Sequence, residues 1–458
     1  MARKTKFDYD LIVIGSGATG STAALAAARS GMSVAMIEGN AYGGESPHYG
    51  DVPIKAMLHA ASLYGEARAG SRFGIRSNML GYNFPTVQTW KDKAIKRSGS
   101  ANNRDHYHRA GIATYDGVAH FLTPHEVVAN RKHLTASKFV VATGTHFSQP
   151  DTYGIDTIKY QTPRTILDVK RIPRSLFIVG ASGDSLEYAQ IFATLGTKVY
   201  VSERASRILP TFDTEASTVL EKHFADNLGV TFLTQTQLSS VEPKGLGTRV
   251  TFSRGQTTKS VQVDEILFLD RAPITDLGLE NAQVDYSPAG IAVDSQLRTS
   301  AQHIFAGGGA TDTSCSTQTA ILHGRIIAHN TANKPIDVPD LNRTPTVVHT
   351  TPSLASVGLT DDDCLRRDLT TNEVVVPLSM VARANVTDST VGFVKLIADK
   401  KGTLIGGTIV APAASDMIHE LTLALHRGMS ASDLASLPHA FLSWSEAIRI
   451  AATKLDAK

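Results

Sequence analysis

The stretch YDLIVIGSGATGSTAALAAARSGMSVAMIE (residues 9–38) indicates how the chain begins to fold. It predicts a buried strand at Leu11–Ile14, a glycine-rich turn and an alanine-rich helix. A second strand follows at Val34–Ile37 and ends at Glu38. Strand, helix and strand in this order are typical of a parallel α/β sheet.

The turn GSGATG has the spacing of a dinucleotide-binding fingerprint. Gly15 permits the sharp bend, Gly17 lets backbone approach a pyrophosphate, and Gly20 lets helix pack on strand. Glu38 follows at a distance suited to accepting a hydrogen bond from a ribose 2′-OH. The pattern predicts dinucleotide binding; the alternative is a glycine turn without a ligand.

A second unit of this shape is SLFIVGASGDSLEYAQIFATLGTKVYVSE (residues 175–203). Its first glycine, Gly180, is present, but Ser182 and Ser185 replace the second and third glycines. Their side chains crowd the place where backbone would meet pyrophosphate. The unit is therefore either a weakened nucleotide site or a structural unit that has lost its nucleotide.

Glu203 ends the second strand of this unit. A carboxylate there would bind a ribose hydroxyl and repel a 2′-phosphate, which favours NADH over NADPH. Arg204 and Arg207 follow closely, and their positive charges would instead favour the 2′-phosphate of NADPH.

Composition narrows the class of protein. The 458 residues carry 45 basic and 43 acidic side chains, a net charge of +2, which gives no footprint for nucleic acid. Only two cysteines, Cys315 and Cys364, are present, and they form no CxxC unit. The apolar run at the N-terminus is short and enters the glycine turn, so it is no signal peptide. No run is long enough for membrane insertion, and we expect a cytoplasmic protein.

The chain divides into four segments. We predict a first dinucleotide-binding domain in two parts, residues 1–150 and 270–338, around a second dinucleotide-binding domain at residues 151–269. Residues 339–458 change in pattern: VVHTTPSLASVGLT, VVVPLSM, GFVKLIAD and GTLIGGTIV predict antiparallel strands. ASDMIHELTLALHRG and SWSEAIRIAATKL predict helices, so this last domain is expected to be α+β.

The order of motifs resembles the pyridine nucleotide–disulfide oxidoreductases, the family of glutathione reductase, lipoamide dehydrogenase and mercuric reductase. The resemblance runs along essentially the whole chain, through GSGATG, GGE…PIK, VVATG, GASGDSLE, HIFAGGG, TPSLASVGLT and SEA. It implies an α/β fold with two Rossmann-like domains and a C-terminal dimerisation domain. It also implies FAD on the first unit, NAD(P)H on the second, and a homodimer.

The resemblance adds further cofactor contacts. It implies contacts with FAD from Gly44, Ala119, Thr143, Gly144, Gly308 and Gly309. The family's second FAD motif ends in Gly-Asp, whose carboxylate holds the ribityl chain. HIFAGGGATD places Gly309 where that aspartate belongs, and Asp312 is the nearest replacement.

The largest departure lies in GGESPHYGDVPIK (residues 43–55). The family's loop reads GGTCxxxxCxPSK and carries a disulfide beside the flavin. Ser46 and Asp51 occupy the two cysteine positions here. Neither a hydroxyl nor a carboxylate can exchange electrons with a disulfide, so we predict that disulfide reduction is lost.

The family's catalytic histidine is missing as well. It belongs to an HPxxxE motif and is supplied across the dimer. In HAFLSWSEA, Glu446 is kept, whereas Phe441 stands at the histidine position. His439 lies two residues early and is a weak substitute.

The resemblance implies that Lys55 and Glu187 pair beside the flavin N5, where nicotinamide would stack. Both positions are filled, which suggests that reduction by NAD(P)H persists; the alternative is an ordinary salt bridge.

Asp51 either faces the flavin as a third catalytic residue or caps the helix that carries Lys55. Cys315 is expected to be a small buried side chain rather than a redox thiol.

We therefore predict an FAD-dependent enzyme that takes hydride from NADH and reduces a small-molecule acceptor other than a disulfide, with no metal. Quinone, oxygen and another nicotinamide nucleotide are candidate acceptors. The first rival is an inactive flavin-binding sensor or scaffold. The second is a soluble transhydrogenase, suggested by His48-Tyr49-Gly50, in which His48 faces either flavin or solvent.

Overall fold

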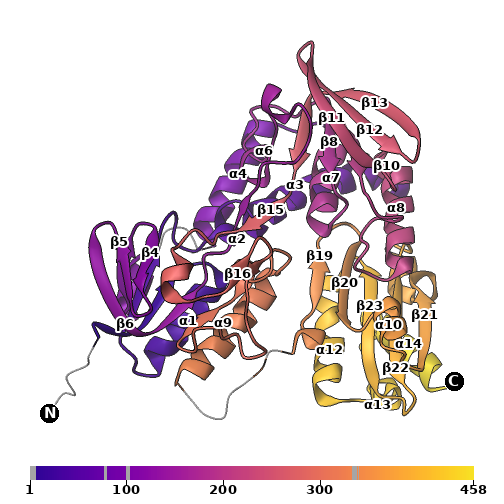
Figure 1. Cartoon of the computed structure of the whole chain (residues 1–458). Helices are drawn as coiled ribbons and strands as arrows, with labels where there is room; N and C mark the ends of the chain where they lie inside the picture. Colours follow the sequence, from indigo (N-terminus) through magenta and orange to yellow (C-terminus); the bar gives the residue numbers. More distant parts are fainter. Residues whose placement is uncertain (1–6, 77–79, 99–103, 333–337, 339, 458) are drawn as a thin grey trace. The chain divides into compact units, whose positions relative to one another are not determined.

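The structure is a computed structural model that describes residues 7–76, 80–98, 104–332, 338 and 340–457 (Figure 1). The chain forms two compact units. The first contains Met1–Pro53, Thr89–Gln149 and Asp270–Leu341, and the second contains Ile54–Gln88, Pro150–Leu269 and Asn342–Lys458. The domain boundaries expected from the sequence stay predictions.

A seven-stranded sheet forms the centre of the first unit. Its parallel part has the order β3-β2-β1-β6, with β18 also on β6, and an antiparallel β4-β5 ribbon continues from β6. The strands are β1 (Tyr9–Ile14), β2 (Val34–Glu38), β3 (Ala113–Asp116), β4 (Ala119–Thr123), β5 (Glu126–Ala129), β6 (Lys132–Val141) and β18 (Ile304–Ala306). The strand–helix–strand order predicted for residues 9–38 is confirmed.

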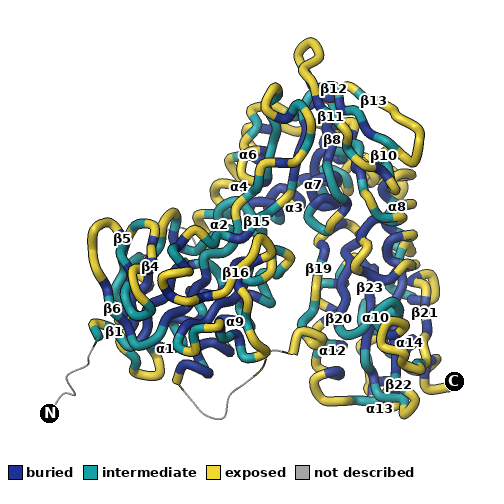
Figure 2. The backbone as a smooth tube through the Cα atoms, viewed as in Figure 1, coloured by how far each residue is buried: buried dark blue, intermediate teal, exposed yellow. Residues whose placement is uncertain are grey.

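Alternate residues of β1 point to opposite faces of this sheet and build two cores. Leu11 and Val13 pack with alanines of helix α1 (Ala18–Arg29). Ile12 and Ile14 pack on the other face with Phe121 of β4. The buried strands between exposed loops are visible in Figure 2. Both faces of β1 are covered, which explains its continuous apolar sequence.

Helices complete the first unit. Helix α9 (Thr317–Ala332) packs along α1 so closely that a Cβ at Gly324 would lie 2.5 Å from the Thr19 carbonyl oxygen. The other elements are α2 (Glu45–His48), α5 (Arg104–Arg109), β7 (Thr145–Phe147), β15 (Arg271–Pro273), β16 (Tyr286–Ser287) and β17 (Gly290–Ile291). Helices α3 (Asp51–Ala69) and α4 (Phe84–Arg97) continue from one unit into the other.

The second unit contains a second parallel sheet, of order β10-β9-β8-β14. Its helices are α6 (Pro163–Ile166), α7 (Gly183–Thr194) and α8 (Thr214–Leu228). The strands of the parallel sheet are β8 (Ser175–Val179), β9 (Lys198–Ser202), β10 (Thr231–Leu233) and β14 (Glu265–Phe268). A separate antiparallel sheet contains β11 (Gln237–Lys244), β12 (Gly247–Arg254) and β13 (Thr257–Val263). The parallel sheet contains the repeated strand–turn–helix–strand unit that the sequence predicts.

The C-terminal part of this unit is an antiparallel sheet of order β19-β20-β23-β22-β21. Its strands are β19 (Thr346–Val348), β20 (Ser353–Gly358), β21 (Thr371–Pro377), β22 (Phe393–Asp399) and β23 (Leu404–Ala411), and its helices are α10 (Asp361–Arg366), α11 (Ala382–Val386), α12 (Ala414–Arg427), α13 (Ala431–Ser436) and α14 (Glu446–Asp456). The predicted α+β character is confirmed. None of the helices within the described residues has the length and apolar character needed to cross a bilayer.

Candidate functional site

The first glycine turn leaves an open helix end. Helix α1 follows Gly17, which has an extended backbone and no side chain to cap the helix. A Cβ at Gly17 would come no closer than 4.0 Å to Gly44. At Gly20, in contrast, a Cβ would lie 1.9 Å from the Gly15 carbonyl oxygen, so only glycine fits. Uncapped N–H groups beside open space suit the pyrophosphate of FAD.

The two strand-end glutamates are held in the same way. Glu38 accepts from the Ser16 N–H at 2.8 Å and from the Asn40 N–H at 2.8 Å, and it also accepts from the Ser16 hydroxyl at 2.6 Å. Glu203 accepts from the Ala181 N–H at 2.8 Å and from the Ala205 N–H at 2.9 Å. Each turn thus fixes its own carboxylate beside the helix end. A carboxylate has roughly four acceptor positions, so both keep capacity for a ribose hydroxyl.

The second turn differs at its helix end. The hydroxyl of Ser182 caps α7 by accepting from the Ser185 N–H at 3.3 Å, and the two hydroxyl oxygens lie 3.1 Å apart. The Ser182 side chain therefore fills the space that stays open at Gly17. Gly180 has a φ of 89°, as the bend requires. A pyrophosphate could bind here only by taking over the hydrogen bonds of the cap.

The further predicted FAD contacts all lie in the first unit. Gly44 meets Gly17 backbone to backbone, since a Cβ at Gly44 would lie 2.7 Å from the Gly17 Cα. Ala119 is buried in β4, and Thr143 donates from Oγ1 to the Ile274 carbonyl at 2.7 Å. Gly144 follows Thr143 with a φ of 72°. Contact of these residues with FAD stays a prediction.

The loop Gly307–Gly309 contains the position where the family's aspartate is replaced. The Gly308 N–H donates to Nδ1 of the buried His323, 3.1 Å away, a contact that the sequence alone did not indicate. A Cβ at Gly309 would lie 2.8 Å from the Thr145 Cγ2. Asp312 accepts two bonds from Ser314 in its own loop.

The residues at the two cysteine positions are hydrogen-bonded to each other. Ser46 Oγ donates to Asp51 Oδ2 at 2.7 Å. Thr317, the first residue of α9, donates to the same oxygen at 2.7 Å. Asp51 is itself the first residue of α3. The carboxylate of Asp51 thus joins its loop to the start of α9, a role that sequence reasoning missed because 266 residues separate the partners.

An ion pair holds the start of the same loop. Glu45 pairs with Arg271 at 2.5 Å, and the guanidinium of Arg271 lies 4.8 Å from the centre of the Phe147 ring. Tyr49 meets the edge of Phe147, with ring centres 6.3 Å apart. His48 is half-buried, and its Nε2 lies 2.9 Å from the Tyr42 carbonyl oxygen. The ring of His48 therefore has a hydrogen-bond partner just before the loop.

Lys55 and Glu187 form the predicted pair. Lys55 Nζ lies 2.7 Å from Glu187 Oε2, and Glu187 Oε1 accepts from the His349 N–H at 2.8 Å. Glu187 is 1% exposed. Burial raises the pKa of Glu187 to about 7, although the charge of Lys55 opposes the increase. This carboxyl group can therefore exchange a proton near neutral pH.

Neither cysteine forms a disulfide. Burial, helped by the charge of Asp312, raises the pKa of the Cys315 thiol to about 12. Burial also raises the pKa of Cys364. Both side chains are therefore protonated thiols at neutral pH, which are poor nucleophiles.

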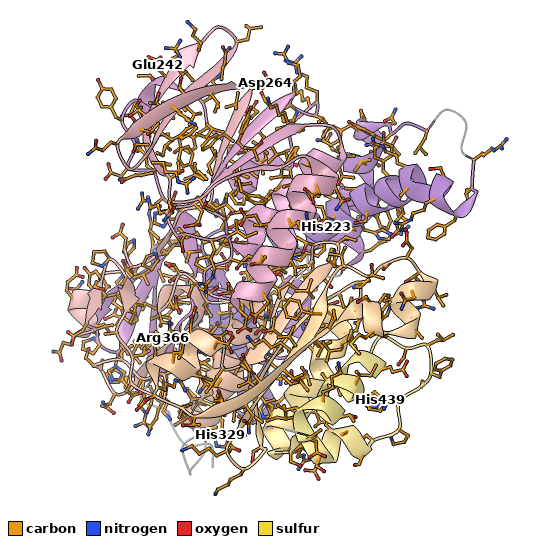
Figure 3. All side chains as sticks on the ribbon, turned by 90° about the vertical axis from the view of Figure 1, so that its right-hand side faces the viewer. His223, Glu242, Asp264, His329, Arg366 and His439 are labelled. Atoms are coloured by element: carbon orange, nitrogen blue, oxygen red, sulfur yellow. The ribbon has the colours of Figure 1, made fainter. Side chains whose placement is uncertain are left out.

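The residues at and near the position of the family's histidine lie in the C-terminal loop. Phe441 is 76% exposed. His439 lies beside the C-terminal helices (Figure 3) and is occupied at both nitrogens: Nε2 lies 2.7 Å from Glu420 and Nδ1 lies 3.0 Å from the Leu437 carbonyl oxygen. Glu446 retains one buried oxygen without a hydrogen bond among the described residues.

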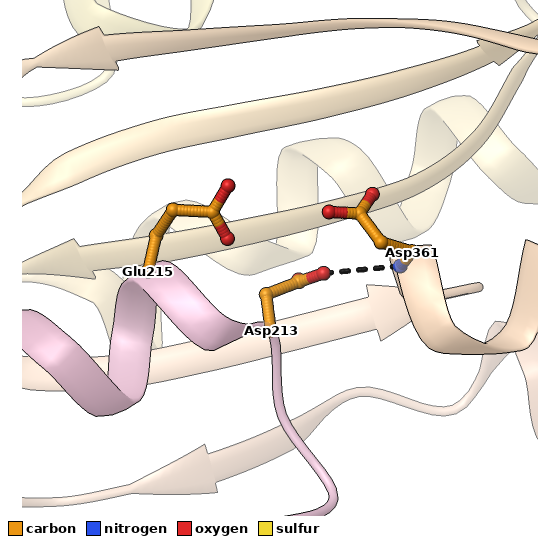
Figure 4. Close-up of side chains that lie close together, drawn as sticks. All are labelled: Asp213, Glu215 and Asp361. Carbon is orange, nitrogen blue, oxygen red and sulfur yellow. Dashed lines mark hydrogen bonds between the residues drawn. The ribbon is translucent and has the colours of Figure 1, made fainter. Parts of the chain in front are cut away.

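A second charged cluster surrounds Lys395, whose side chain is fully buried on β22. Its Nζ lies 2.9 Å from Glu215, 3.5 Å from Glu373 and 3.6 Å from Asp213, and it also pairs with Asp361. Figure 4 shows Asp213, Glu215 and Asp361 pointing toward one another. Their oxygens are close enough to hold a metal ion, but the ammonium of Lys395 already supplies a positive charge.

The chain thus contains two strand–turn–helix units of dinucleotide-binding type, and each has a glutamate at the end of its second strand. Residues 9–324 match the model of the family described as pyridine nucleotide-disulphide oxidoreductase, and residues 344–452 match its dimerisation domain. The chain belongs to the pyridine nucleotide-disulphide oxidoreductase family. FAD and NAD(P) are typical cofactors of this family, and the dimerisation domain implies a homodimer.

Relatives match along nearly the whole chain. Mercuric reductase from Streptomyces lividans is 33% identical over 454 residues, covering 97% of this chain and 95% of that protein. Dihydrolipoyl dehydrogenase from Geobacillus stearothermophilus is 31% identical over 448 residues, covering 94% and 93%. Among solved structures, LpdA from Mycobacterium tuberculosis has a TM-score of 0.86 at 27% identity, covering 97% of this chain and 99% of that one.

Proposed function

We propose that this protein is a homodimeric FAD-dependent oxidoreductase that takes hydride from NADH and passes electrons to an acceptor other than a disulfide. Quinone, oxygen or another nicotinamide nucleotide fits as the acceptor. When bound, FAD supplies the electron-transfer chemistry, while the protein binds and orients the reactants. A cytoplasmic location remains part of this prediction.

The hydrogen bond from Ser46 to Asp51 is the observation that carries the proposal. It occupies the positions at which the family has its disulfide, and it can neither form a mixed disulfide nor store two electrons. The two cysteines are both free, and their thiols are protonated. These observations support direct transfer of electrons from the flavin to an acceptor. They speak against the dithiol chemistry that the name of the dihydrolipoyl dehydrogenase relatives describes.

The pair formed by Lys55 and Glu187 supports retention of the reductive step. We assign Lys55 the role of holding a positive charge in place through its 2.7 Å contact with Glu187. We assign Glu187 the role of holding or releasing a proton, since its pKa of about 7 lies at working pH. Glu203, fixed by two backbone N–H groups, supports NADH as the preferred donor.

One observation favours the inactive rival. The hydroxyl of Ser182 already caps α7, so the second turn does not offer an open anion site. If this cap excludes nicotinamide nucleotides, the protein keeps FAD as a structural or sensing group without turnover.

Visible absorption of the pure protein separates these functions. We expect a yellow protein whose flavin absorbance is bleached by NADH in the absence of oxygen. A preparation that is colourless and does not take up added FAD contradicts a flavoprotein. A yellow protein that NADH leaves unchanged, while dithionite bleaches it, supports the inactive rival.

A further inference from the structure

The loop after Glu203 is fixed at both ends. At its start, the carboxylate of Glu203 accepts from the Ala205 N–H. Further along, the Leu209 N–H donates to the Ala181 carbonyl at 2.9 Å, and Ile208 and Leu209 are buried. Leu209 has a φ of 48°, a conformation that non-glycine residues rarely adopt. Hydrogen bonds on both sides of Arg207 therefore hold the backbone that carries it.

The two arginines of this loop differ in their surroundings. Arg204 is exposed to solvent. Arg207 is drawn onto the protein: its Nη2 lies 2.7 Å from Asp362 of α10 and 3.1 Å from each of the carbonyl oxygens of Pro210 and Phe212. Three acceptors thus share one nitrogen of the guanidinium.

The surroundings of Arg207 leave one donor of its guanidinium group unsatisfied. Its Nε is buried and has no hydrogen-bond partner among the described residues. An unmet buried donor costs free energy, and this cost is recovered when the group reaches a better acceptor. The ion pair is also partly exposed, with side-chain exposures of 25% for Arg207 and 46% for Asp362. Asp362 is the shortest and the only charged of the three contacts of Nη2, so its removal weakens the hold on Arg207 most.

We propose that Asp362 determines nucleotide specificity from a distance, by holding Arg207 away from the ribose 2′ position beside Glu203. The inference rests on the proposed function, because it concerns the same nucleotide site. A guanidinium near the ribose accepts a 2′-phosphate, whereas a carboxylate there rejects it. Two features then disfavour NADPH: the fixed carboxylate of Glu203 and the sequestration of Arg207.

Two small probes isolate the 2′-phosphate: adenosine 5′-monophosphate, and adenosine 2′,5′-bisphosphate, which differs only by that group. Their binding to the full-length flavoprotein is measured by calorimetry for the wild type, Glu203→Ala, Asp362→Ala and the double variant. Asp226→Ala is the matched control, because it breaks another 2.7 Å ion pair of the same unit, with Lys222.

We expect Glu203→Ala to improve the ratio of bisphosphate to monophosphate affinity. Adding Asp362→Ala should improve that ratio by about a further tenfold, as a new charge-assisted hydrogen bond forms. Replacing Arg207 by Ala in the double variant should remove this second gain, and Asp226→Ala should leave the wild-type ratio unchanged.

Equal ratios in Glu203→Ala and in the double variant would overturn the inference while leaving the proposed function intact, provided that the monophosphate binds. If neither probe binds any variant while NADH still bleaches the flavin, the inference fails and the proposed function stands. If NADH does not bleach the flavin either, both fail. A second gain that persists without Arg207 would also overturn the inference.

Discussion

Ser46 Oγ lies 2.7 Å from Asp51 Oδ2, so a hydrogen bond joins the two positions at which the family carries its disulfide. Thr317 donates to the same oxygen and ties the loop to the start of α9. The loop therefore keeps a link between its ends without a covalent bond. In the function proposed above, this carboxylate stands where the family has a sulfur that can hold electrons.

Replacing Asp51 by Asn should raise the reduction potential of the bound flavin by a few tens of millivolts. A carboxylate disfavours the addition of electrons nearby. For a carboxylate about 4 Å from the reduced ring and an effective dielectric constant near 20, the repulsion would be about 4 kcal/mol. For two electrons this corresponds to a ceiling of about 90 mV, which solvent and neighbouring charges reduce. Redox titration against indicator dyes measures the shift.

Ser46→Ala is the control for this variant, since it removes a partner of Asp51 but no charge. Its potential should stay close to that of the wild type. If Asp51→Asn leaves the potential unchanged and only lowers the melting temperature, the role of Asp51 is confined to holding the loop.

Glu38 and Glu203 lie in separate turns, so replacing each glutamate should weaken the binding of a different nucleotide. Glu38→Gln should weaken retention of FAD, because one of two backbone N–H groups loses its acceptor and the ribose loses an anionic partner. Glu203→Gln should leave FAD in place and weaken NADH binding by about tenfold or more. Flavin content after dialysis and the KM for NADH measure the two effects. Loss of FAD from the Glu203 variant alone would reverse the assignment of the turns.

Glu187 predicts a pH dependence of stability. Its pKa is raised by burial to about 7 from an ordinary value of 4.5. Between these values the folded protein holds a proton that the unfolded chain has released, so the contribution of Glu187 to stability falls as pH rises from about 4.5 to 7. The total fall is roughly 3 kcal/mol.

Denaturant unfolding of the wild type and of Glu187→Gln between pH 5 and 8 tests this dependence. The free energy of unfolding of the wild type, relative to the variant, should decrease with pH and level off above pH 7. Parallel curves for the two proteins would show that Glu187 does not titrate in this range.

The cluster around Lys395 predicts a rescue by metal. Lys395→Ala leaves the buried Asp213 and the partly exposed Glu215 and Asp361 without their cation. The variant should lose about 2–3 kcal/mol of stability, less than for a fully buried pair because solvent reaches two of the three carboxylates. Millimolar Mn²⁺ should then raise the melting temperature of the variant and leave that of the wild type unchanged, because Asp213, Glu215 and Asp361 can share an ion.

Lys222→Ala provides the control, since it breaks a solvent-exposed pair with Asp226. It should change stability by less than about 0.5 kcal/mol and show no response to Mn²⁺. An equal Mn²⁺ effect on Lys395→Ala and the wild type would show that the cluster is not a cation site.

Local patterns made most of the fold predictable. The periodic apolar strands and the turn at Gly15–Gly20 indicate both parallel sheets, and alternation indicates the C-terminal antiparallel sheet. The contact of Thr317 with Asp51 could not be predicted, because it depends on how distant helices begin at one place. The sequence predicts that Ser182 obstructs a pyrophosphate, and the spacing of Ser182 from Ser185 also fits the helix cap that the structure has.

The cluster around Lys395 had one signal in the sequence. A lysine stands in the middle of GFVKLIAD, where both faces of a central strand are buried. Such a lysine needs an acidic partner. Its partners come from α8, α10 and β21, and no local pattern brings these segments together.

Anaerobic titration with NADH tests whether flavin is the only redox centre of the protein and whether NADH reduces it. We predict complete bleaching at about one NADH per FAD, because one hydride carries the two electrons that a flavin holds. No long-wavelength thiolate–flavin band should develop on the way. Uptake of a second equivalent, or a flavin that NADH does not bleach, would contradict this prediction.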